Sequence, residues 1–165
     1  MLEPRNHWAD TSEEVFTAHA LDDHISADII IVGGGFTGCS AALEVAKSGA
    51  KVVLIEAHGI GHGGSGRNVG LVNAGLWLPP DDIVSRIGKA DGERLITSLS
   101  RAPKEVFDLI NNYQIQCNAV QNGTVHCAHS ASGFEDLIQR HSQWKALGAP
   151  VDLLGAQETQ NLIGT

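Results

Sequence analysis

The first group of residues that can bind a ligand is a glycine motif between two apolar runs. Residues 33–38 read Gly-Gly-Gly-Phe-Thr-Gly, which fits G-x-G-x-x-G. We expect Gly33 to allow a tight turn, Gly35 to let a pyrophosphate approach the backbone, and Gly38 to let a helix pack closely on a strand. The N–H groups at the start of that helix, with the positive end of its dipole, attract phosphate. The predicted cofactor-binding residues here are Gly33, Gly34, Gly35, Phe36, Thr37 and Gly38.

A carboxylate follows at a distance that suits the same ligand. Glu56 lies 18 residues after Gly38, at the end of a second apolar run. A carboxylate in this place accepts hydrogen bonds from both ribose hydroxyls of an adenosine, and it repels a 2′-phosphate, which disfavours NADP. A glycine-rich turn in an unrelated βαβ unit is the alternative, but strand, glycines, helix, strand and acid in one register favour a dinucleotide.

A second polar cluster lies in a glycine-rich stretch at residues 57–75, which holds seven of the 19 glycines of the chain. We expect no regular element there, but a segment that wraps a ligand closely. Ser65, with Gly66 beside it, can donate to a phosphate or a ribityl chain. Arg67 supplies a fixed charge, and Asn68 can donate and accept. A mobile surface loop with a solvated arginine is the alternative.

The elements that must position these residues are two strands and a helix. The β-branched runs at 28–32 and 51–55 predict buried parallel strands, and residues 39–48 predict a helix that Gly49 ends. This order is a Rossmann-like βαβ unit of the α/β class. It brings the glycine turn and Glu56 to the carboxyl edge of the sheet, where open α/β sheets bind cofactors.

The order GGGFTG, a strand ending in Glu56, then GxGGSGRN resembles the N-terminal part of the D-amino-acid oxidase family of FAD-dependent oxidoreductases. The gamma-glutamylputrescine oxidase-like branch is the most similar, and the likeness covers about residues 28–78. It implies FAD, with the glycines at the pyrophosphate, Glu56 at the adenosine ribose and residues 65–68 toward the flavin. Val69 stands where a second glycine is common and Gly64 where alanine is common, so the likeness does not carry over the substrate.

The rest of the chain predicts three regions. Residues 1–27 read as an acidic, extended arm lying over the body, 28–80 as the FAD-binding βαβ unit with its glycine-rich wrap, and 81–165 as a helical segment and the start of a mixed α+β substrate domain. The pattern predicts helices from Pro80 to about residue 86, at 91–112 with a kink or break at Pro103, at 130–147 and at 156–163. It also predicts strand-like segments at 115–117, 124–128 and 151–154.

Composition excludes several classes. A net charge of −8 argues against nucleic acid and anionic membranes as partners. Cys39, Cys117 and Cys127 are too far apart to indicate a zinc site or a disulfide framework, and the histidine spacing predicts no metal site. We find neither a signal peptide nor a membrane span in the sequence, and we expect a cytoplasmic protein.

These observations predict an FAD-dependent oxidoreductase that oxidises the C–N bond of a small amine or amino acid by hydride transfer to flavin. No residue of the chain has the surroundings of a catalytic base, and family members are more than twice as long. We therefore expect an N-terminal portion with an unfinished sheet, whose unpaired apolar edge can self-associate. Two alternatives stay open: an NAD-dependent Rossmann dehydrogenase, and a truncated, non-catalytic nucleotide-binding module.

Overall fold

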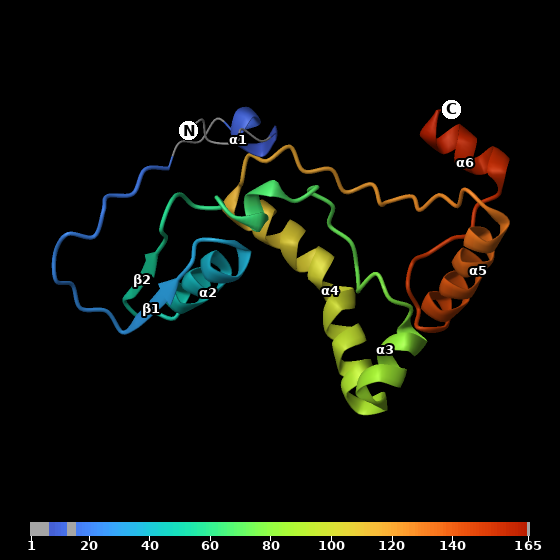
Figure 1. Ribbon diagram of the computed structural model, residues 1–165, viewed down its shortest axis with the longest axis horizontal. Helices are drawn as coiled ribbons and strands as arrows, with labels where there is room; N and C mark the ends of the chain where they lie inside the picture. Colours follow the sequence, from blue (N-terminus) through green and yellow to red (C-terminus); the bar gives the residue numbers. More distant parts are fainter. Residues whose placement is uncertain (1–6, 13–15, 165) are drawn as a thin grey trace. The chain divides into compact units, whose positions relative to one another are not determined.

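The computed structural model describes residues 7–12 and 16–164 (Figure 1). Its internal contacts divide the chain into two compact units, Met1–Leu71 and Val72–Thr165. The domain boundaries at residues 27 and 80 stay a prediction.

The first unit contains a βαβ arrangement built on two short apolar runs. Strands β1 (Ile29–Val32) and β2 (Val52–Ile55) pair in parallel, with Ile29 opposite Val52 and Val32 opposite Ile55. Helix α2 (Phe36–Lys47) connects them and packs against both. It ends where Gly49 takes a φ of +86°, a left-handed conformation that favours glycine. The predicted α/β class is confirmed.

Helix α2 begins three residues earlier than the sequence predicts. Glycine is a poor helix former, so residues 36–38 read as a turn. In the structure Gly35 is the N-cap, and Gly38 lies inside the first helical turn. The glycine pattern therefore overlaps the helix.

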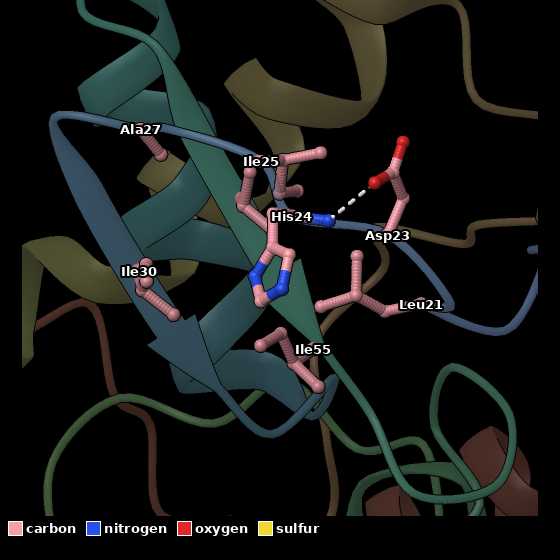
Figure 2. A pocket seen from close by; sticks show the side chains of 8 residues that line it. Leu21, Asp23, His24, Ile25, Ala27, Ile30 and Ile55 are labelled. Carbon is pink, nitrogen blue, oxygen red and sulfur yellow. Dashed lines mark hydrogen bonds between the residues drawn. The ribbon is translucent and has the colours of Figure 1, made fainter.

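The two faces of the β1–β2 pair have different neighbours. A Cβ on Gly38 of α2 would lie 3.5 Å from Cγ2 of Ile31, so the Ile31 face looks toward α2. Because side chains alternate along a strand, Ile30 points to the other face. There it lines a pocket with Val53 and Ile55, and the pocket is completed by arm residues that Figure 2 shows gathered over the strands: Leu21, Asp23, His24, Ile25 and Ala27.

Of the predicted arm, residues between 21 and 27 lie over the sheet, and the described part of the arm is not extended throughout. Helix α1 (His7–Thr11) interrupts it, whereas residues 16–27 contain neither helix nor strand. The predictions for residues 1–6 and 13–15 lie outside the described part of the chain.

The second unit consists of four helices: α3 (Pro80–Ile87), α4 (Lys89–Tyr113), α5 (Ala131–Ala146) and α6 (Ala156–Ile163). Pro80 stands in the first turn of α3, where a missing N–H costs nothing. Helices α3 and α4 meet at Gly92, where a Cβ would lie 2.9 Å from the Cα of Val84. Among the described residues the buried hydrophobic core is limited to Ile83, at 3% exposure, and Ile96, at 7%.

Several predictions for this unit are wrong. Helix α4 continues through Pro103, so the predicted break there is wrong, while the predicted kink stays a prediction. A proline removes one N–H, and the rest of the 25-residue helix still supplies its hydrogen bonds. The predicted strands at 115–117, 124–128 and 151–154 are absent, and these segments are irregular. A strand requires a neighbouring strand with which its backbone N–H and C=O groups pair, and the sequence pattern alone does not show whether one is present. None of the described helices is long and apolar enough to cross a membrane.

Candidate functional site

The first part of the site is the turn from β1 into α2. Gly33 has a φ of +105°, and its N–H donates to the carbonyl of Ile55 at 2.8 Å, which ties the turn to the end of β2. A Cβ on Gly38 would lie 1.8 Å from the carbonyl oxygen of Gly33. Gly33 therefore makes a tight turn, and Gly38 allows the helix to pack closely on it.

Glu56 comes directly after β2, and its carboxylate binds the glycine turn. Its Oε2 accepts from the N–H of Gly34 at 2.7 Å, and its Oε1 accepts from the N–H of His58 at 3.1 Å. The pKa of Glu56 is held below its ordinary value of 4.5 because both bonds stabilise the charged carboxylate, the bond from Gly34 more than the bond from His58. Each carboxylate oxygen keeps a second lone pair with which it can accept a ligand hydroxyl.

The glycine-rich stretch folds back onto the same turn. The N–H of Gly61 donates to the carbonyl of Gly34 at 2.8 Å, and a Cβ on Gly34 would lie 2.6 Å from Cδ1 of Ile60. The prediction that this stretch holds no regular element is wrong over four residues, where the 3-10 helix η1 (Gly64–Arg67) forms. Its Gly66 is required by packing, since a Cβ there would lie 2.2 Å from the carbonyl oxygen of Gly61.

Ser65 joins the two predicted parts of the site. Its Oγ accepts from the N–H of Phe36, the first residue of α2, at 3.0 Å. Gly35, the N-cap, has no side chain with which to do this, so Ser65 caps the helix from a position 29 residues later. A Cβ on Gly35 would lie 2.7 Å from this Oγ, so Gly35 makes room for Ser65 as well as for a ligand. The hydroxyl hydrogen of Ser65 is still able to donate outward.

Arg67 and Asn68 are placed differently from each other. Arg67 is exposed, and its Nε donates to the carbonyl of Gly63 at 3.2 Å. The side chain of Asn68 is used inside the loop: Nδ2 donates to the carbonyl of Ser65, and Oδ1 accepts from the N–H of Gly70 at 2.6 Å. Asn68 therefore shapes the loop more than it faces outward.

Trp8 is the residue that sequence reasoning missed. Its Nε1 donates to the backbone carbonyl of Asn68 at 2.8 Å, across 60 residues of sequence. Its ring lies against Gly70, where a Cβ would approach Cζ2 to 2.5 Å. A tryptophan in an otherwise polar arm was the available signal, but nothing local indicates its partner.

The histidines and cysteines add no metal centre in the described residues. His58 and His62 stack with ring centroids 4.4 Å apart, and no group of three or more metal-binding side chains is found there. Cys39, Cys117 and Cys127 are free thiols.

A comparison with models of known protein families identifies the family of this chain. The model described as FAD dependent oxidoreductase matches residues 28–164, which is most of the chain. The chain belongs to this family. The predicted resemblance is confirmed, and the match begins where the arm ends, one residue before β1.

Curated relatives agree with this family. The chain is 31% identical over 145 residues to gamma-glutamylputrescine oxidoreductase of Escherichia coli (strain K12), covering 87% of this chain and 33% of that protein. It is 29% identical over 139 residues to the probable oxidoreductase OrdL of Haemophilus influenzae, covering 84% and 32%. A shorter match, 35% over 69 residues, links it to the aerobic glycerol-3-phosphate dehydrogenase of Staphylococcus haemolyticus, covering 42% and 12%.

The chain thus spans about a third of the length of the first two relatives. No solved structure matches it.

Proposed function

We propose that this chain carries the FAD-binding βαβ unit, Rossmann-like in order, of an oxidoreductase that acts on a small amine or amino acid. One observation carries the proposal: Glu56 and Ser65, from two separate segments, both bind backbone N–H groups at the turn into α2. A turn of this kind, with an exposed helix N-terminus beside it, is a ready-made place for a pyrophosphate.

The residues fit FAD in their chemistry. Gly35 has no side chain between the loop and the helix N-terminus, and Ser65 retains a donor for a phosphate oxygen. Glu56 retains lone pairs for the ribose hydroxyls while its present bonds keep it charged. The proposed cofactor-binding set is Gly33, Gly34, Gly35, Phe36, Thr37, Gly38, Glu56, Ser65, Gly66, Arg67 and Asn68.

The proposed reaction is oxidation of a C–N bond. FAD, when bound, supplies an acceptor for the hydride from the carbon beside nitrogen. The contribution of this chain is to hold the adenosine half through Glu56 and the glycine turn, and to direct residues 65–68 toward the other half. The likeness to gamma-glutamylputrescine oxidoreductase supports an amine substrate. We name no catalytic base within this chain.

A direct test compares nucleotides on protein freed of any bound cofactor. We expect FAD to bind tightly, with quenching of its flavin fluorescence, and NADH and NADPH to bind at least tenfold more weakly. Tight NADH binding without FAD binding would favour the NAD-dependent dehydrogenase. FAD binding with no turnover of any amine or amino acid would favour a non-catalytic nucleotide-binding module.

A further inference from the structure

The N-terminal arm reaches the proposed cofactor loop, although the arm lies before residue 28, where the family match begins. Helix α1 lies against η1, and its Trp8 contacts residues that follow η1. The indole Nε1 bonds the carbonyl of Asn68, and the ring covers the Cα of Gly70. One side chain thus holds the loop at two points just after η1.

Within the described part of the chain, few other contacts hold the loop at residues 65–68 in place. Its residues are exposed or only partly buried. Asn68 ties the loop to itself by bonds to Ser65 and Gly70 rather than to a neighbouring element. Among the described residues, two hydrogen bonds join residues 65–68 to other elements: the N–H of Phe36 at the start of α2 donates to Ser65, and Trp8 donates to the carbonyl of Asn68. Since they hold opposite ends of η1, the position of Ser65 depends on both.

Gly70 is shaped for this contact. Its φ is +74°, and the space that a Cβ would fill is taken by the six-membered ring of Trp8. Trp8 as a whole is 41% exposed, so its ring is covered only in part, where it lies against Gly70. A tryptophan can hold a loop in this way, by covering backbone with part of its ring while its indole N–H has a hydrogen-bond partner.

We propose that Trp8 is a positioning residue: it clamps the 65–68 loop so that Ser65 stays on the N-terminus of α2, and the arm thereby sets how firmly FAD is retained. The second clause rests on the proposed function, whereas the first does not. Trp8 makes no contact with the cofactor in this scheme and acts through Asn68.

The test uses three variants of the protein. Trp8→Ala removes both contacts, and Trp8→Phe removes the hydrogen bond but keeps an aromatic ring on Gly70. Phe16→Ala is the matched control, because Phe16 is an aromatic residue of the same arm and is 74% exposed. All three are examined with and without FAD.

The first readout is the rate of trypsin cleavage after Arg67, next to the clamped carbonyl, in FAD-free protein. We expect Trp8→Ala to raise it about tenfold, Trp8→Phe about threefold and Phe16→Ala not at all, which are the ratios expected from losing one or two weak contacts. Cleavage after Lys89, in the other unit, serves as the internal reference. An unchanged rate after Arg67 in Trp8→Ala overturns the clamp.

The second readout is the dissociation constant of FAD and the fine structure of the visible flavin band. We expect weaker binding and a less resolved band in the order wild type, Trp8→Phe, Trp8→Ala. Faster cleavage with unchanged FAD binding overturns the link between the arm and the cofactor. If the wild type binds no FAD, the proposed function fails, while the cleavage rates still decide whether Trp8 holds the loop.

Discussion

Gly35 has two roles, and a double-mutant cycle with Ser65 separates them. In the wild type, a methyl group at residue 35 would lie 2.7 Å from the Oγ of Ser65. The serine must then rotate away and lose its bond to the N–H of Phe36. In a Ser65→Ala background there is no Oγ, and the two Cβ atoms would lie 3.6 Å apart, an ordinary contact.

The magnitude follows from the bond that is lost. A helix-capping bond contributes about 1 kcal/mol to the free energy of unfolding. The backbone of Gly35 is extended, with φ −88° and ψ −171°, so alanine fits it without strain. Alanine gains about 0.4–1 kcal/mol by restricting the unfolded chain, and this gain is offset because glycine is a better N-cap residue than alanine. Gly35→Ala should therefore be destabilising by about 1 kcal/mol in the wild type, and nearly neutral in Ser65→Ala. The coupling free energy is about 1 kcal/mol.

The assay is urea unfolding of the four FAD-free proteins, followed by FAD titration of each. Equal effects of Gly35→Ala in both backgrounds would refute the contact with Ser65. If a pyrophosphate approaches Gly35, the methyl group weakens FAD binding in both backgrounds. Recovery of FAD binding in the double variant would mean that Gly35 serves Ser65 and not the cofactor.

Three further predictions concern the same site. Gly38→Ala should destabilise the βαβ unit by about 2–4 kcal/mol in urea unfolding, because the added Cβ would lie 1.8 Å from the carbonyl oxygen of Gly33 and the backbone must move. A decrease in the free energy of unfolding below about 0.5 kcal/mol would contradict the observed packing. Because the pKa of Glu56 is lowered in the folded state, the charged carboxylate stabilises the fold above pH 4.5, and this contribution is lost as the pH falls below 4.5 toward the folded-state pKa. Glu56→Gln should therefore flatten the acid side of the curve of stability against pH. An unchanged curve would show that the bond between Glu56 and Gly34 is unimportant for stability. Arg67→Ala should weaken FAD binding without changing the urea midpoint, because Arg67 is exposed, and unchanged FAD affinity would identify it as a solvated charge.

The local part of the site could be predicted from sequence. The turn at Gly33 and the close packing at Gly38 depend on residues that are near in the chain, and each glycine has a specific backbone reason to be there. The N-terminus of α5 is similar, since Ser130 bonds the N–H of Gly133 as a cap should. Such features are decided within a few residues, so a pattern indicates them.

The long-range part could not be predicted. The sequence suggests that Ser65 meets a ligand, but not that it caps α2, and it gives no sign that Trp8 bonds Asn68. The apolar run at 124–128 has the composition of a strand, but nothing in its pattern shows whether a neighbour is present, and Val125 is left exposed. Pairing between distant segments depends on the whole fold and not on local preference.

Self-association through an unpaired edge of the sheet stays a prediction. Ile30 is exposed and Val32 is 83% exposed, which leaves apolar surface on β1. Such a surface favours association with a further strand or a second copy. Sedimentation of the purified protein over a range of concentrations checks whether it self-associates.

The central claim is that the turn at Gly33–Gly38 and the loop at residues 65–68 hold FAD. The most direct measurement is the absorption spectrum of the purified protein, followed by heat release and identification of the bound dinucleotide. We predict flavin absorption bands and release of FAD, either from the protein as purified or after incubation with FAD and removal of the excess. A colourless protein that retains no FAD after such incubation, or one that releases NAD instead, would contradict the account.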